Sequence, residues 1–334
     1  MLDDAMKQWA RRVVPTDVKA LRNFLTAERK STLPFSDPAL MLSGFHSNRP
    51  FVYPERPSTA KGYISDLDFL RRIDGLNPAQ VRRELSDKLG FAERMQAEGF
   101  GDRMPRMFGV SRDGRFEVTE EYSGEPIIIK PVDGRAGQGI SAFTSLDDAL
   151  AACPPDRTFL VQERVQAHAY GREIFPGSLN ALRVQVVRRT PGAGPVVAAV
   201  VQRMGSRATA PAHSLTAGGL VARVTPDGVL TYAIGPTRGR HRERFDTHYE
   251  TGGQITGRVV PFYAEALDLA RELMTLYPDA LYVGWDIAIA ERGPIVLEGN
   301  ATWPNLATLQ AHGPFANAPE VRDFFVERGL LRVG

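Results

Sequence analysis

The sequence has a single cysteine, Cys153, among its 334 residues. One cysteine cannot form an internal disulfide, so a disulfide framework is excluded and a reducing compartment is expected. No apolar run approaches the roughly 18 residues that a membrane-spanning helix needs. The start of the sequence, MLDDAMKQW, is acidic and lacks the apolar core of a signal peptide. These absences predict a cytoplasmic protein without a membrane span.

An excess of charge of one sign is also missing. The formal net charge is only +2, so nucleic acid is not an expected partner. The six histidines show no zinc-ligand spacing, and neither a Walker A nor a Rossmann glycine motif occurs. The composition is that of a globular protein, with 43% hydrophobic residues and enough length for two or three subdomains. Nothing in the sequence specifies an oligomeric state.

The clearest pattern in the sequence is that of Leu281–Asn305, which predicts two apolar strands joined by a turn. A three-residue turn at 291–293 places Asp286 directly opposite Glu298. Alternation along the strands puts Asn300 on the same face. The opposite face is expected to be buried, and it would carry Ile287, Ile289, Ile295 and Leu297.

This acidic face predicts a metal site. Opposed residues lie about 4.5–5.5 Å apart at Cβ, so two carboxylates there repel unless a proton or a cation lies between them. Carboxylate and amide oxygens suit Mg²⁺ or Mn²⁺ bridging the phosphates of a substrate. We therefore expect Asp286, Glu298 and Asn300 to be metal ligands. A hairpin with a solvated polar edge is the alternative.

A glycine loop follows the strand expected at Pro126–Lys130, with glycines at 134, 137 and 139. Glycine lets backbone N–H groups approach phosphate oxygens closely, and Lys130 adds positive charge at the end of the strand. The loop therefore indicates a phosphate site, although an ordinary turn is the alternative for the loop taken alone.

The rest of the pattern predicts an α+β fold. Two amphipathic helices are expected within Met1–Arg29, then an irregular connection over Ser31–Ser58. Further helices are expected within Lys61–Gly101, one of them over Leu85–Ala97, and at Val260–Leu276 and Pro319–Arg328. The strand-like runs are Phe159–Glu163, Ala181–Arg189, Val196–Met204, Leu220–Val224 and Val229–Ile234.

The lysine and glycine loop, the later strand that carries Glu163, and the acidic hairpin together resemble the ATP-grasp superfamily. The sequences PGSLNALR at 176–183, GGL at 218–220, His248 ahead of Thr251-Gly252, and GWDI at 284–287 resemble the sugar-transfer-associated ATP-grasp group. The resemblance implies two α+β subdomains that clasp ATP between antiparallel sheets, with an N-terminal helical extension. The expected divisions are an extension and linker (1–60), a helical part (61–103), a lid (104–168) and a catalytic subdomain with a C-terminal helix (169–334).

The resemblance also implies roles for single residues. Lys88, Lys130, Gly134, Gly137, Gln138 and Gly139 would contact the triphosphate. Glu163 would lie in the hinge that holds adenine and ribose, and the backbone of Arg164 and Val165 would read the base edge. Asn180 and Arg183, with Lys130, would face the transferred phosphoryl group, and Arg183 would also bind the substrate carboxylate. A structural ion pair is the alternative for Arg183. Gly218, Gly219 and His248 would contact the substrate, and a structural role is the alternative for His248. His213-Ser214 stands where this group often has an Asp-Asn pair, a departure that bears on the acceptor.

The implied activity is that of an ATP-dependent ligase that needs Mg²⁺ (or Mn²⁺). A carboxylate attacks the γ-phosphate to give an acyl phosphate and ADP, and an amine or a thiol then displaces phosphate. The expected partners are small-molecule carboxylate and amine co-substrates, which could be linked to a sugar or a peptide. Two alternatives remain: a kinase with the same fold, which leaves the phosphate on one acceptor, and a non-catalytic nucleotide-binding module of a biosynthetic assembly.

Overall fold

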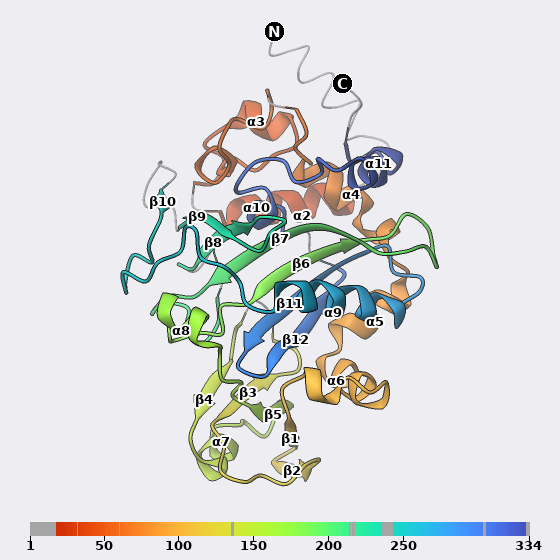
Figure 1. Ribbon diagram of the computed structural model, residues 1–334. Helices are drawn as coiled ribbons and strands as arrows, with labels where there is room; N and C mark the ends of the chain where they lie inside the picture. Colours follow the sequence, from red (N-terminus) through yellow and green to blue (C-terminus); the bar gives the residue numbers. More distant parts are fainter. Residues whose placement is uncertain are drawn as a thin grey trace.

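The protein contains two antiparallel sheets, of which the larger lies in the middle of the molecule and the smaller forms the lower lobe in Figure 1. The computed structural model describes residues 18–31, 33–59, 61–134, 137–213, 215, 218–235, 243–302 and 305–331. The smaller sheet has the strand order β2-β1-β5-β3-β4, and the larger one has the order β10-β9-β8-β7-β6-β11-β12. Helices pack on both sheets, so the predicted α+β class with two antiparallel sheets is confirmed.

One face of the smaller sheet is covered by the helix that follows β4, and the other face is directed toward the larger sheet. Its elements are β1 (Met107–Arg112), β2 (Arg115–Val118), β3 (Ile127–Pro131), β4 (Ser141–Phe143), α7 (Leu146–Ala151) and β5 (Phe159–Glu163). Ile127, Ile129 and Val161 pack with α7 in the core of this sheet. Because side chains alternate along a strand, Lys130 and Gln162 face the opposite way, toward the larger sheet.

The larger sheet is covered on both faces. Its elements are α8 (Ala169–Ile174), β6 (Leu182–Val187), β7 (Val196–Met204), β8 (Leu220–Val224), β9 (Leu230–Ile234), β10 (Arg244–Phe245), α9 (Tyr263–Thr275), β11 (Tyr282–Ala290) and β12 (Gly293–Asn300). One face packs with α9 around Trp285, which is fully buried. The other packs with the helices α10 (Leu306–Leu309) and α11 (Pro319–Glu327).

The described N-terminal helices are α2 (Val18–Arg29), α3 (Pro38–Leu42), α4 (Asp66–Leu76), α5 (Ala79–Ser86) and α6 (Lys88–Ala97), with short 3-10 turns at Arg49–Phe51 and Gly101–Arg103. α4, α5 and α6 pack against the larger sheet, and α2 packs on α4. The first of the two helices expected within Met1–Arg29 lies outside the described residues, and the second is α2. The predicted start of a helix at Leu85 is wrong. Asp87 ends α5 and caps α6, because its carboxylate accepts hydrogen bonds from the N–H groups of Leu89 and Gly90.

The hairpin of β11 and β12 confirms one prediction and corrects two. Asp286 pairs with Glu298, as expected. The predicted three-residue turn is wrong, because Ala290 pairs with Gly293 and only two residues form the turn. The turn is one residue shorter than predicted, so one residue of β12 has no partner on β11. That residue is Leu297, which forms a β-bulge, and Asp286 and Glu298 therefore remain opposite each other.

The bulge reverses the faces of the residues between it and the turn. Ile287 and Ile289 enter the core around Trp285, as expected, together with Val296. The prediction that Ile295 and Leu297 share that face is wrong. Ile295 packs on the opposite side with Val165 and Ala290, and Leu297 contacts the same cluster. An apolar patch therefore lies beside the acidic pair.

No helix in the described ranges is both long and apolar enough to cross a membrane.

Candidate functional site

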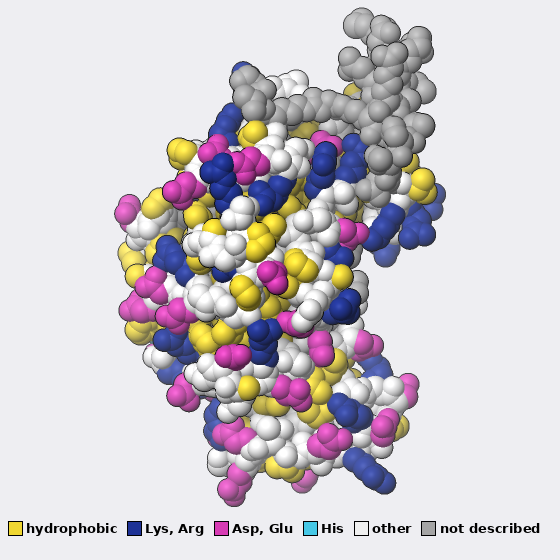
Figure 2. Space-filling view, turned by 90° about the vertical axis from the view of Figure 1, so that its right-hand side faces the viewer, with side chains coloured by type: hydrophobic (Ala, Val, Ile, Leu, Met, Phe, Trp, Pro, Cys, Tyr) yellow, Lys and Arg dark blue, Asp and Glu magenta, His cyan; other side chains and the backbone are white. Residues whose placement is uncertain are grey.

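A cavity of about 620 Å³ lies between the two sheets. Figure 2 shows the outline narrowing between the main body and the lower lobe, which Figure 1 identifies as the smaller sheet. Side chains of Lys130 and Gln162 line the cavity from the smaller sheet, and Asp286 and Glu298 line it from the larger one. The predicted lid and catalytic parts thus contribute to one site.

The predicted phosphate ligands gather at one end of the cavity. Lys88 extends from the first turn of α6 to the base of the glycine loop, where its Nζ donates to the carbonyl oxygens of Pro131 (3.3 Å), Val132 (3.2 Å) and Gly134. Lys88, Lys130, Gly134, Gly137 and Gln138 line the cavity, whereas Gly139 does not. Two lysines and a glycine loop therefore lie together, as a phosphate site requires.

Lys130 has an unusual electrostatic setting. Burial lowers the pKa of its ammonium group to about 8, and the nearby charge of Lys88 acts in the same direction, while Glu298 opposes them. A buried ammonium group gains from an anionic partner, because the anion favours its charged form. This setting favours binding of an anion beside Lys130.

The glycine loop closely approaches the segment between β7 and β8. Gly137 has a φ of +79°, and a Cβ there would lie 2.5 Å from the Cβ of Ala212. A side chain at this position would therefore both strain the backbone and displace the loop.

The acidic pair faces the lysines across the cavity. Asn300 Nδ2 donates to Glu298 Oε1 at 3.2 Å. Burial raises the pKa of Glu298, and the neighbouring Asp286 carboxylate raises it further. Burial would also raise the pKa of Asp286, but the guanidinium groups of Arg183 and Arg203 outweigh it and hold that pKa well below its usual range.

Arg183 lies beneath this site and does not line the cavity. Its side chain is 2% exposed, and it binds Asp286 through Nε (2.5 Å) and Nη2 (3.0 Å). The amide oxygen of Asn305 is placed to accept from the same guanidinium group. This setting matches the structural ion pair named as the alternative, and the catalytic role of Arg183 stays a prediction.

Arg203 is the basic residue of β7 that lines the cavity, and the sequence reasoning missed it. Its Nη1 lies 3.1 Å from Asp286 Oδ2. The sequence contains a signal for it, since Arg203 is the charged residue in the run VVAAVVQRM, which is apolar except for Gln202 and Arg203. A lone arginine in a buried strand needs an acidic partner or a ligand.

His213, which precedes β8, also lies near Arg203 and Asp286. It lines the cavity, and burial together with the charge of Arg203 lowers its pKa to about 3. The imidazole is therefore neutral at pH 7, so it adds no charge beside the acidic pair.

Several predicted residues lie outside the lining of the cavity. Asn180 is 1% exposed, and its amide donates to the carbonyl oxygens of Gly171 and Phe175 and accepts from Ser178 and from the N–H of Gly205.

His248 is likewise buried, with Nε2 2.8 Å from the carbonyl oxygen of Gly205, and it stacks on Phe175. Gly218 accepts a hydrogen bond from Tyr249, and Gly219 directly precedes β8. These contacts stabilise the loops around the site, and the direct roles of these residues stay predictions.

The predicted hinge connects the sheets at the other end. Glu163, Arg164 and Val165 line the cavity. Glu163 forms an ion pair with Arg292 in the β11–β12 turn (2.7 Å) and accepts from the N–H of Arg106. The N–H of His168 donates to Ile289, so this connection lies along the hairpin.

The donor set fits a divalent cation only together with a substrate. No group of three or more His, Cys, Asp or Glu side chains that could hold a metal occurs in the described part of the chain. Both oxygens of Asp286 already accept from arginines, which leaves Glu298 as the more available carboxylate. Asn300 donates to Glu298 and is not among the residues that line the cavity, so its role as a ligand stays a prediction. Mg²⁺ commonly uses one or two carboxylates plus phosphate oxygens, and these residues fit that pattern.

Comparison with solved structures gives distant neighbours. A D-cycloserine synthetase is 14% identical, with 76% of this chain and 73% of that one covered and a TM-score of 0.43. A phosphoribosylamine–glycine ligase from Thermotoga maritima is 14% identical (79% and 60% covered, TM-score 0.46). An L-amino acid ligase from Bacillus licheniformis is 10% identical (67% and 42%, TM-score 0.39). This chain thus spans less than two thirds of the length of the latter two proteins.

Sequence comparisons are more specific. No curated protein matches the chain. The model of the sugar-transfer associated ATP-grasp family matches residues 149–316, which is half of the 334 residues. This segment contains β5, the hinge, Arg203 and the acidic hairpin. The chain therefore belongs to the sugar-transfer associated ATP-grasp family.

Proposed function

We propose that this protein is an ATP-dependent ligase that joins a carboxylate to an amine through an acyl phosphate. One observation carries the proposal: Lys88, Lys130 and the glycine loop line the same cavity as the Asp286–Glu298 pair. Cations and backbone N–H groups on one side, and acids on the other, form the setting that a nucleotide triphosphate with a divalent cation needs.

Each group has a separate task in this proposal. Lys88, Lys130 and the N–H groups of the loop bind the β- and γ-phosphates. Glu298 and Asn300, with Asp286, would hold Mg²⁺, which neutralises charge on the phosphates when it is bound. Arg203 lies next to the acidic pair and stabilises the negative charge of the phosphoryl group during transfer.

The reaction proceeds in two balanced steps. A carboxylate oxygen attacks the γ-phosphorus, the bond to the β-phosphate oxygen breaks, and ADP leaves. The amine then attacks the acyl carbon, a proton leaves the nitrogen, and inorganic phosphate departs. Because water would hydrolyse the acyl phosphate, the glycine loop must cover the site during both steps.

A two-part experiment tests the proposal. ATP binding is measured by calorimetry, and pooled carboxylates and amines are then screened for ADP release, with mass spectrometry of the products. We expect ADP and inorganic phosphate only when both co-substrates are present. Phosphate retained on one acceptor would identify a kinase, and tight ATP binding without turnover would identify a binding module.

Two variants connect this activity to the cavity. Lys130→Ala and Glu298→Ala should retain the folded structure and lose at least about 100-fold in kcat/KM, because each removes a group that acts on the phosphates or the cation. Lys19→Ala is the matched control, since Lys19 on α2 forms an exposed ion pair with Asp74 on α4. Full activity in both site variants would refute the site assignment.

A further inference from the structure

The two connections between the smaller sheet and the rest of the protein lie side by side. The chain enters β1 after residues 104–106 and leaves β5 at Glu163, and β1 pairs with β5. The N–H of Arg106 donates to the carboxylate of Glu163 at 3.1 Å, and the N–H of Glu163 donates to the carbonyl oxygen of Arg106 at 2.9 Å. Because both connections pass through one place, the sheet could rotate about it as about a hinge. Its orientation therefore depends on further contacts.

Arg292 supplies such a contact from the larger sheet. It is the second residue of the two-residue turn between β11 and β12. Its guanidinium group donates to both carboxylate oxygens of Glu163, at 2.7 Å and 2.8 Å. It also donates to the carbonyl oxygen of Met104 at 3.0 Å. One side chain thus binds both the segment that enters the smaller sheet and the strand that leaves it.

The pair of Arg292 and Glu163 has the features of a strong ion pair. Two parallel hydrogen bonds between a guanidinium group and a carboxylate fix geometry as well as adding energy. The side chain of Glu163 is only 13% exposed, so water screens the pair less than at an open surface. Burial would raise the pKa of Glu163, but the hydrogen bonds from Arg292 and from the N–H of Arg106 outweigh it and lower that pKa. The carboxylate is therefore charged at neutral pH.

The neighbouring turn residue forms an ion pair that does not reach the smaller sheet. Glu291 pairs with Arg172 of α8 at 2.8 Å, and Arg172 also donates to the carbonyl oxygen of Ala167. The helix α8 packs in the core of the larger sheet. Of these two adjacent ion pairs, only that of Arg292 connects one sheet to the other.

We infer that Arg292 is a positioning residue that holds the smaller sheet in the orientation that nucleotide binding requires. Arg292 does not line the cavity, so it acts through Glu163 and Met104 and not on the ligand. Lys130 lies on the smaller sheet and Glu298 on the larger one, so a nucleotide that meets both needs the sheets in one orientation. The link to the nucleotide rests on the proposed function, whereas the anchoring of the sheet does not.

A distance measurement tests the anchoring without nucleotide. Val118→Cys on β2 and Val259→Cys ahead of α9 are exposed positions for two dyes, in a Cys153→Ser background that removes the native cysteine. Single-molecule energy transfer should show one narrow population when Arg292 is present. Arg292→Gln should broaden this distribution, because the smaller sheet is then free to rotate. Glu291→Gln is the matched control and should keep the narrow population.

Calorimetry with ATP and Mg²⁺ separates positioning from a general loss of structure. When only a fraction of the molecules has the competent orientation, the apparent affinity falls by that fraction. Arg292→Gln should therefore bind ATP about fivefold more weakly, as the loss of one partly exposed ion pair predicts, with an unchanged number of sites. Partial misfolding would instead lower the number of sites and leave the affinity unchanged. Glu291→Gln should bind ATP as the wild type does.

Glu163→Ala removes the other partner and should broaden the distance distribution in the same way, so the anchoring is tested even if one variant does not fold. A distribution as narrow as that of the wild type, in either folded variant, would overturn the role of Arg292 and leave the ligase proposal intact. A broad distribution with unchanged ATP affinity in Arg292→Gln would overturn its role in nucleotide binding. Wild-type protein that does not bind ATP would overturn the proposed function, and the dye distances would still decide the anchoring.

Discussion

At the scale of single residues, Asp286 combines a structural contact with a place in the cavity. Its carboxylate accepts from Arg183 and Arg203, and Arg183 is almost completely buried. A carboxylate that neutralises a buried guanidinium group cannot be removed without leaving an unpaired charge in the interior. Asp286 therefore matters for stability as well as for any ligand.

This arrangement predicts a large effect of Asp286→Asn on folding. We expect the free energy of unfolding to fall by about 3–5 kcal/mol, because Arg183 loses its counter-charge. Urea unfolding without nucleotide or metal measures it. Asp268→Asn is the control, since Asp268 pairs with Arg271 at the surface of α9 and should cost at most about 0.5 kcal/mol. Equal losses in the two variants would show that the buried ion pair contributes little.

Single residues are the scale at which the sequence is least informative. A motif predicts that Asn180 and Arg183 face the phosphoryl group, and in the structure their side chains bond to the protein, so these roles stay predictions. Arg203, which reaches the cavity, belongs to no motif. A motif gives residue types and spacing. Whether a polar side chain faces a ligand or a partner depends on strands that lie far away in the sequence.

At the scale of elements, the β11–β12 hairpin shows how one residue decides the faces of a strand. Strand existence and the pairing of Asp286 with Glu298 followed from alternation of apolar and polar residues. The bulge at Leu297 could not be predicted in this way, because an extra residue does not change the pattern of an apolar sequence such as PIVLEG. Its effect is to turn Leu297 toward the cavity.

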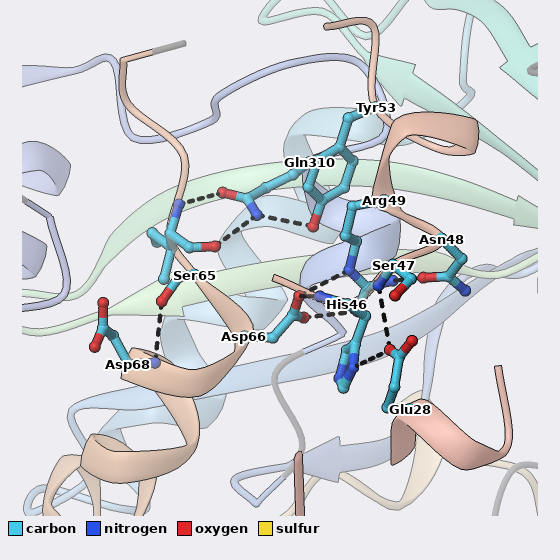
Figure 3. A network of polar contacts seen from close by, with 11 residues as sticks. Glu28, His46, Ser47, Asn48, Arg49, Tyr53, Ser65, Asp66, Asp68 and Gln310 are labelled. Atoms are coloured by element: carbon cyan, nitrogen blue, oxygen red, sulfur yellow. Dashed lines mark hydrogen bonds and ion pairs between the residues drawn. The ribbon is translucent and has the colours of Figure 1, made fainter. Parts of the chain in front are cut away.

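The N-terminal elements are held by a buried polar network (Figure 3). Glu28 of α2 accepts from the backbone N–H of Phe35 (2.8 Å) and Ser47 (3.2 Å) and lies 2.9 Å from His46 Nδ1. Arg49 binds both carboxylate oxygens of Asp66 at the start of α4. These contacts join segments that the sequence marked only as an irregular connection, so long-range pairing was needed to predict them.

This network predicts a dependence of stability on pH. Burial would raise the pKa of Glu28, but the hydrogen bonds from Ser47, Phe35 and His46 outweigh it and lower the pKa below 4.5. A group with a lowered pKa stabilises the fold above its unfolded pKa, and this contribution is lost as the pH falls below about 4.5. Glu28→Gln should therefore cost about 2 kcal/mol at pH 7 and progressively less as the pH falls below about 4.5.

The measurement is urea unfolding of wild type and Glu28→Gln over a pH series. Glu93→Gln, at an exposed position of α6, is the control and should differ from wild type by a small amount at every pH. A constant difference between Glu28→Gln and wild type down to the lowest pH would contradict the assignment of this pH dependence to Glu28.

At the scale of the whole molecule, the site exists only because the two sheets meet. The family match begins at residue 149, whereas Lys88, Lys130 and the glycine loop precede it. The cavity nevertheless includes these residues together with Glu298 and Arg203. The sequence predicted both halves of the site separately. How the two halves meet could not be predicted from the sequence, because it rests on contacts between distant segments. Among them are the ion pair of Glu163 with Arg292 and the close approach of Gly137 to Ala212.

That contact yields a prediction about closure. In Gly137→Ala the new Cβ would meet Ala212, so the loop can no longer lie against the 211–213 segment. Because a misplaced phosphate loop disturbs the reacting geometry, kcat/KM for ATP should fall about 10- to 100-fold. Gly192→Ala is the matched control: its φ is +76°, and no atom lies within 4 Å of the added Cβ.

Comparison with Gly192→Ala separates the effect of the contact with Ala212 from the effect of backbone strain, because only the strain is common to both variants. Both variants place alanine in the left-handed region and should lose a similar free energy of unfolding, about 1 kcal/mol. Only Gly137→Ala should also lose activity and ATP affinity. If the two variants lose activity equally, the glycine loop does not act by closing on the 211–213 segment, and the phosphates must be held by the lysines without it.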